Sequence, residues 1–276
     1  MTQPVGPIGV FDSGLGGLSV LKELTRAMPE EDFIYLGDIA RLPYGTKSKE
    51  VVTKYSISCA NFLVSQKVKA LVVACNTASA LALESLKSHL SIPVVGVIEP
   101  GVKAAMASSS DSEKPVLVLA TEGTVRSEAY LKEFQRLGYV GTVKQLACPL
   151  LVPLAEEGWF HHPLTQAIIE TYLFSESNPF GGSFRGTLLL GCTHYPLLES
   201  SFEKVLGDKV SIIHGAKILA EELKVQLIKN ELKSIQEQPQ NRLGTIQFFS
   251  TDQIRASLPI LKALFQTQVS FSVVDL

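Results

Sequence analysis

Two short segments of the chain share one pattern, an apolar run that ends in a small residue and then a cysteine. The first is Leu71-Val72-Val73-Ala74-Cys75-Asn76-Thr77, and the second is Leu188-Leu189-Leu190-Gly191-Cys192-Thr193-His194. A short continuous apolar run is typical of a strand that is buried on both faces, as in a parallel sheet covered by helices. The pattern therefore predicts an α/β protein in which two strands each carry a thiol at the carboxyl end.

Strands and helices are expected to alternate along the rest of the chain, which predicts mainly parallel sheets with helices on both faces. Further strands are expected at 7–11, 32–36, 92–97, 115–120, 142–146, 210–213, 245–250 and 269–274, with a polar connector at 233–243. Helices are expected at 18–28, 48–66, from Cys75 to about residue 90, near 101–110, 127–137, 162–174, 196–206 and 216–232, and one more is expected between the last two strands.

The repeated cysteine segments predict two similar, doubly wound domains that face each other. We expect the first domain to comprise residues 1–98 and 211–276, and the second to comprise residues 99–210. Ligands of such folds bind at the carboxyl ends of the strands, where both sulfur atoms are expected. The active site is therefore predicted in the cleft between the domains.

The composition is that of a soluble globular protein. The chain has 276 residues, of which 46% are hydrophobic, and a formal net charge of −2. This charge argues against nucleic acid as the primary partner, and no apolar stretch approaches the roughly 20 residues that span a bilayer. We expect a cytoplasmic protein, in which the four cysteines are reduced thiols rather than disulfides.

A single cysteine at the end of a strand is usually a small core residue, so either thiol alone favours a structural interpretation. Polar residues follow each cysteine, namely Asn76 and Thr77 in one segment and Thr193 and His194 in the other. They favour a functional interpretation of the two thiols. Such side chains need hydrogen-bond partners when buried, and they are good ligands for a carboxylate. The matched segments therefore indicate two thiols that act on one substrate.

A glycine-rich loop, Phe11 to Gly17, follows the first expected strand and precedes a helix. Its backbone amides are candidates for holding an anion at the helix start, although a tight turn also explains the glycines and no nucleotide motif is present. Asp12 at the strand end is costly to bury unless it is paired or functional. By contrast, Cys59 is expected in the core, Cys148 has no assigned chemical role, and the pair at 161–162 is expected on the surface.

Several motifs together resemble the glutamate racemases of the cofactor-independent aspartate/glutamate racemase superfamily. They occur in order over most of the chain to about residue 200. The matching elements are Phe11 to Gly17, Tyr35 to Asp38, Pro43-Tyr44-Gly45, Ala74 to Ser79, Ala120-Thr121, Gly123-Thr124-Val125, Cys148-Pro149, Val152 to Leu154 with Glu156, and Gly191 to Pro196.

This resemblance implies a two-base mechanism, in which an acid and a base flank the Cα of the substrate and exchange roles with direction. It implies that Cys75 and Cys192 are the bases, that Asp12 assists Cys75, that His194 assists Cys192, and that Glu156 joins His194 or meets the substrate ammonium. The substrate would be held by Asp12, Ser13, Tyr44, Gly45, Asn76, Thr77, Thr121, Thr124, Thr193 and His194. Neither pyridoxal phosphate nor a metal is implied.

The resemblance favours glutamate as the substrate, although aspartate differs from it by one methylene, which is worth only about 1 to 3 kcal/mol of discrimination. It also implies D-glutamate supply for peptidoglycan synthesis and cell shape, a muramyl precursor as a candidate activator, and a homodimer. The alternatives are a racemase for aspartate or another amino acid, and a non-catalytic protein that binds gyrase.

Overall fold

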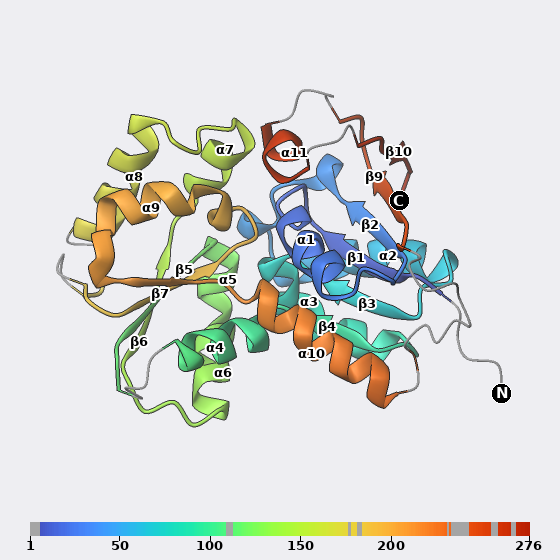
Figure 1. Cartoon of the computed structure of the whole chain (residues 1–276), viewed down its shortest axis with the longest axis horizontal. Helices are drawn as coiled ribbons and strands as arrows, with labels where there is room; N and C mark the ends of the chain where they lie inside the picture. The colour runs from blue at the N-terminus through green and yellow to red at the C-terminus, as the bar shows by residue number, and fades with distance from the viewer. Residues whose placement is uncertain are drawn as a thin grey trace.

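The computed structural model describes residues 6–108, 113–175, 178–180, 184–230, 232, 243–254, 259–265 and 269–276. Within these residues two sheets lie side by side, each covered by helices (Figure 1). The larger sheet has the order β10-β9-β2-β1-β3-β4 and the smaller β6-β5-β7-β8. All strand pairs in both sheets are parallel, which confirms the expected α/β class.

The strands are short and mostly buried, as their apolar composition requires. The larger sheet comprises β1 (Ile8–Asp12), β2 (Phe33–Gly37), β3 (Ala70–Val73), β4 (Val94–Gly96), β9 (Ile246–Ser250) and β10 (Ser272–Val273). The smaller comprises β5 (Val116–Ala120), β6 (Val143–Ala147), β7 (Thr187–Gly191) and β8 (Ser211–Ile213).

We call the larger sheet and the helices packed on it the large lobe. One core lies between this sheet and helices α1 (Leu18–Ala27), α10 (Ala216–Lys229) and α11 (Pro259–Leu264). A second core lies on the opposite face, under α2 (Lys49–Ser65) and α3 (Asn76–His89). Two short 3-10 helices, η1 (Ile39–Arg41) and η2 (Tyr44–Thr46), follow β2.

The smaller sheet and its helices form the small lobe. Helices α4 (Ile98–Ala107) and α6 (Ala129–Arg136) cover one face. Helices α7 (Leu151–Glu156), α8 (Pro163–Phe174) and α9 (Glu199–Leu206) cover the other. The remaining short helices are α5 (Glu122–Ser127), η3 (Tyr195–Leu198) and η4 (Gly207–Lys209). No helix among the described residues is both long and apolar enough to cross a membrane.

The structure differs from the expected element boundaries in a few places. Strand β8 pairs with β7 in the smaller sheet, so we propose that the chain returns to the large lobe near Gly215 rather than at residue 211. The helix expected over 196–206 is divided into η3 and α9, and α5 and α7 were not expected as separate helices. Most of the connector expected at 233–243 lies outside the described residues.

Candidate active site

The two cysteines lie at the carboxyl ends of β3 and β7, in different lobes. Cys75 is the N-cap residue of α3, and Cys192 directly follows β7. Their exposed fractions are 4% and 7%. Both residues line one small cavity, together with residues of the loops that follow β1, β2 and β5. The two thiols therefore face one shared space between the lobes, as the sequence predicted.

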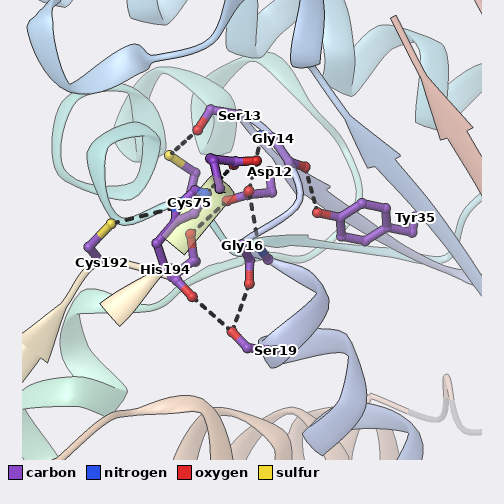
Figure 2. Close-up of polar contacts among 12 residues, drawn as sticks. Asp12, Ser13, Gly14, Gly16, Ser19, Tyr35, Cys75, Cys192 and His194 are labelled. Carbon is purple, nitrogen blue, oxygen red and sulfur yellow. Dashed lines mark hydrogen bonds and ion pairs between the residues drawn. The ribbon is translucent and has the colours of Figure 1, made fainter. Parts of the chain in front are cut away.

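The sulfur of Cys75 makes two hydrogen bonds: it accepts one from the backbone N–H of Ala78, and its thiol donates one to the hydroxyl oxygen of Ser13. The backbone nitrogen of Ala78 lies 3.5 Å from Sγ. Oγ of Ser13 lies 3.4 Å from Sγ (Figure 2). Burial and the nearby Asp12 carboxylate nevertheless raise the pKa of Cys75 to about 12. At neutral pH Cys75 is therefore a protonated thiol, with contacts that moderate the cost of its ionisation.

Cys192 has different surroundings, because an imidazole lies beside it. Nδ1 of His194 is 3.9 Å from Sγ of Cys192 (Figure 2), and Nε2 is 2.5 Å from Oε1 of Glu156. Burial lowers the pKa of His194, but its contacts with Cys192 and Glu156 outweigh that effect and raise it well above the ordinary histidine value. The arrangement therefore favours a protonated imidazole next to this sulfur, and a positive charge there stabilises a thiolate.

Asp12 is fully buried and holds the glycine-rich loop. Its Oδ2 accepts hydrogen bonds from the backbone N–H groups of Gly14 and Gly17, each at 3.0 Å, and the Thr193 hydroxyl lies 3.4 Å from Oδ1. Burial raises the pKa of Asp12 despite these bonds and the charge of His194. The sequence suggested that the amides of this loop bind an anion. For Gly14 and Gly17 this expectation is corrected, because their N–H groups already donate to the Asp12 carboxylate.

Three threonine hydroxyls form a cluster across the boundary between the lobes. Oγ1 of Thr77 in α3 is 2.9 Å from Oγ1 of Thr121, which in turn is 3.1 Å from Oγ1 of Thr124. The third side of the triangle, from Thr124 to Thr77, is 3.4 Å long. Because each hydroxyl can donate and accept, this cluster has the chemistry to bind a carboxylate, as does the nearby hydroxyl of Ser13.

Glycines bring the two lobes close together around the cavity. A Cβ atom at Gly16 would lie 2.5 Å from Oγ1 of Thr193 and 2.7 Å from Nδ1 of His194. A Cβ atom at Gly45 would lie 2.6 Å from Cβ of Thr121. Since non-bonded atoms essentially never approach so closely, the loops of one lobe can contact the other only without side chains at these positions.

Ten of the thirteen distinct residues predicted for the site line the cavity: Ser13, Tyr44, Gly45, Cys75, Asn76, Thr77, Thr121, Cys192, Thr193 and His194. The other three support it from behind, since Asp12 and Thr124 are fully buried and Glu156 reaches the cavity through His194. Tyr44 lines the cavity, but its hydroxyl donates to Asp38 instead of pointing to a ligand.

The prediction omitted two apolar lining residues, Leu42 and Val152, and it did not include Pro43 among the site residues. Pro43 and Val152 belong to the motifs that carried the resemblance, whereas Leu42 gives no sequence signal of its own. A tyrosine that was not expected, Tyr130, accepts a hydrogen bond from Nδ2 of Asn76 at 2.8 Å.

The cavity between the cysteines has a volume of about 20 Å³, which is room for about one water molecule. A larger cavity of about 410 Å³ lies next to it and shares the wall formed by Leu42, Pro43, Gly45, Thr121 and Val152. An amino acid is larger than the inner cavity. Its binding between the two thiols therefore requires the shared wall or the lobes to move apart.

The residues with expected structural roles lie outside this cavity. Cys59 is fully buried in the core of the large lobe, as predicted, and its sulfur lies 3.8 Å from a guanidinium nitrogen of Arg41. His161 and His162 are exposed, also as predicted. His162 caps α8 by accepting from the N–H of Leu164, and His161 contacts Ser200.

Comparison with known proteins identifies relatives along nearly the whole chain. Residues 8–223 match the model of the Asp/Glu/Hydantoin racemase family. The chain is 48% identical over 250 residues to a glutamate racemase of Geobacter metallireducens, covering 91% of this chain and 89% of that protein.

Solved structures give the same result. Glutamate racemase isoform RacE1 of Bacillus anthracis superposes with a TM-score of 0.88 and 37% identity, covering 99% of this chain and 98% of that one. Glutamate racemase of Francisella tularensis in complex with D-glutamate has a TM-score of 0.83 and 34% identity, with coverages of 98% and 97%.

A more distant structure is that of Escherichia coli glutamate racemase in complex with L-glutamate and the activator UDP-MurNAc-Ala. It is 26% identical with a TM-score of 0.70, and the match covers 94% of this chain and 95% of that one. The family match spans most of the chain, and the relatives agree with it in both sequence and fold. The chain therefore belongs to the Asp/Glu/Hydantoin racemase family.

Proposed function

We propose that this protein is a glutamate racemase, an isomerase that interconverts L- and D-glutamate by proton transfer at Cα between two cysteines. The observation that carries the proposal is the single cavity lined by Cys75 from one lobe and Cys192 from the other. Inversion requires a base on one face of Cα and an acid on the other, and two thiols that enter one cavity from different lobes can provide both. The names of the relatives support glutamate as the substrate.

The unequal surroundings of the sulfurs give each a starting role. Burial and Asp12 raise the pKa of Cys75, so Cys75 starts as the thiol and acts as the acid; Cys192, whose sulfur lies 3.9 Å from Nδ1 of His194, is assigned the role of the base. The Cys192 thiolate takes the Cα proton of one enantiomer, and the Cys75 thiol then donates its proton to the opposite face. The sulfurs end with exchanged protonation states, which is the form that accepts the other enantiomer.

The remaining polar residues are assigned to binding and support. We assign the hydroxyls of Ser13, Thr77 and Thr121 to the carboxylates of glutamate, because these three residues line the cavity. Asp12 supports the glycine-rich loop and Thr193, and it acts on Cys75 through its charge. Glu156 is assigned to His194 instead of the substrate ammonium, because its carboxylate is already hydrogen-bonded to the imidazole.

The test is to follow circular dichroism of D-glutamate, L-glutamate and L-aspartate solutions in deuterium oxide, with purified protein and no added cofactor. We expect the signal of both glutamate enantiomers to decay to zero, with deuterium at Cα, while aspartate is unchanged. A decay with aspartate alone would show that aspartate is the substrate instead of glutamate. No decay with any of the three amino acids and folded, reduced protein would refute the racemase proposal.

We further propose that the enzyme works in the cytoplasm as a homodimer and supplies D-glutamate for peptidoglycan synthesis. The motif resemblance supports these roles, and the activator complex of the E. coli relative supports a muramyl-peptide precursor as a regulator. Sedimentation of the purified protein tests the dimer. An increase in kcat on addition of UDP-MurNAc-Ala tests the regulation, and an unchanged rate would argue against it.

A further inference from the structure

Tyr130 lies between the two segments that carry the cysteines. It is in the first turn of α6 and is 1% exposed. Its ring belongs to the core between α6 and the smaller sheet, together with Val118 and Leu189. A Cβ atom at Gly191 would lie 2.9 Å from Cε2 of this ring, so the ring packs directly against the residue that precedes Cys192.

The hydroxyl of the same tyrosine reaches the other lobe. Nδ2 of Asn76, the residue that follows Cys75, donates a hydrogen bond of 2.8 Å to the Tyr130 oxygen. Both side chains are buried, and α3 contacts α6 along this boundary. One side chain therefore connects the immediate chain neighbour of each cysteine, through its ring on one side and through its hydroxyl on the other.

A second small cavity lies next to Tyr130 and the Cys192 segment. It has a volume of about 20 Å³, it shares Asn76, Cys192 and Thr193 with the cavity between the cysteines, and Tyr130 also lines it. Packing around Cys192 is incomplete there, so the position of this segment depends strongly on the contacts that remain. Burial also raises the pKa of Tyr130 above its ordinary range, which keeps the hydroxyl neutral.

We propose that Tyr130 is a positioning residue that fixes the placement of Cys75 relative to Cys192 across the boundary between the lobes. The proposal rests on the two-cysteine mechanism, in which both sulfurs must be aligned with Cα at the same time. Loss of the hydroxyl frees Asn76 and loosens the two lobes against each other. The expected defect is therefore in proton delivery to the second face of Cα.

The test compares Tyr130→Phe with wild type and with a matched control, Tyr172→Phe. Tyr172 belongs to the same lobe, and its hydroxyl accepts a hydrogen bond of 3.2 Å from the backbone N–H of Leu150, a residue of the small lobe. We expect Tyr130→Phe to lower kcat about ten- to hundredfold, as misplacement of reacting groups does, with KM within about a factor of two. The control is expected to keep the wild-type kcat.

The informative readout is the fate of the Cα proton in deuterium oxide. A misaligned pair leaves the carbanion longer beside the thiol that took its proton. Once that thiol has exchanged its proton with deuterium oxide, it returns a deuteron to the original face, so Tyr130→Phe should raise the ratio of deuterium incorporation with retention to incorporation with inversion. A residue that only stabilises the fold would lower the melting temperature and leave this ratio unchanged. Asn76→Ala breaks the same hydrogen bond from the large lobe and should raise the ratio as well.

The outcomes separate this proposal from the proposed function. If wild type racemises glutamate but both variants keep its ratio, the positioning role is wrong while the racemase function stands. If wild type does not exchange or invert Cα, the racemase proposal fails and the positioning role fails with it. If Tyr130→Phe does not fold, the ratio measured for Asn76→Ala decides, since that variant keeps the tyrosine ring in the core.

Discussion

The hydrogen bond between Glu156 and His194 gives the sharpest single test of the proposed mechanism. The bond is 2.5 Å long, and the side chains are 22% and 3% exposed. Replacement by Gln keeps the length of the side chain and removes its charge. A hydrogen bond to a charged partner contributes about 1.5 to 3 kcal/mol, and the partial exposure of Glu156 favours the lower end. We therefore expect kcat/KM to fall about tenfold in Glu156→Gln.

The direction in which the pH dependence of kcat/KM changes follows from the direction of the pKa shift of His194. Glu156 helps to raise the pKa of His194, so it favours the protonated imidazole. Without that charge the imidazole loses its proton at lower pH, and the alkaline limb of the kcat/KM profile should move toward neutrality. The enantiomers of glutamate are equally stable, so kcat/KM must fall by the same factor in both directions.

The assay is the circular dichroism measurement of both directions between pH 6 and pH 10, taken as roughly the range around the ordinary titration of histidine and cysteine. The matched control is Glu157→Gln, the same change at the next position, where the side chain is exposed. The reasoning is refuted if Glu156→Gln retains wild-type kcat/KM with an unmoved alkaline limb, or if Glu157→Gln loses as much activity.

Three further predictions follow from the same geometry. Cys75→Ser and Cys192→Ser should each abolish racemisation in both directions while the far-ultraviolet circular dichroism stays native, and near-normal turnover by either variant would exclude the two-thiol mechanism. Because burial and Asp12 raise the pKa of Cys75 to about 12, its alkylation by iodoacetamide should be slow at neutral pH and accelerate toward that value, as measured by mass spectrometry of the labelled peptide; a rate that levels off near neutral pH would contradict the shift. Gly45→Ala places a Cβ 2.6 Å from that of Thr121 and should lower the melting temperature and kcat/KM together, at a cost of about 1 to 3 kcal/mol; wild-type values for both would show that the loop yields freely.

The sequence was most informative where a strand ends. The apolar runs before Cys75 and Cys192 allow few alternatives to buried parallel strands, and polar residues directly after such strands must meet at one edge. The same local logic could not assign Tyr130, because its position depends on how α6 packs against Gly191 and α3. The sequence also could not predict the role of Asp12. A carboxylate that accepts hydrogen bonds from its own loop and a carboxylate that binds a ligand have the same sequence pattern.

The sheet that a short strand joins was hard to predict for a similar reason. Ser211–Ile213 was expected to begin the return to the first domain, yet its pairing with β7 places it in the smaller sheet. The sequence of a short apolar strand does not indicate which sheet it joins, because contacts with residues far away in the chain determine the pairing. Helix α7 was missed because its six residues include Pro153, which argues against a helix unless it lies in the first turn, as it does here.

The glycine contacts between the lobes have a consequence for how such a protein can diverge. At Gly16 and Gly45 the backbone of one lobe lies directly against side chains of the other, namely Thr193, His194 and Thr121. A larger residue on either side has no space that a change on the opposite side could readily provide, because the partner atoms themselves form the site. Hybrids that join the lobes of two relatives should therefore retain activity only where both parents have the same residues at these contacts, however well each lobe folds.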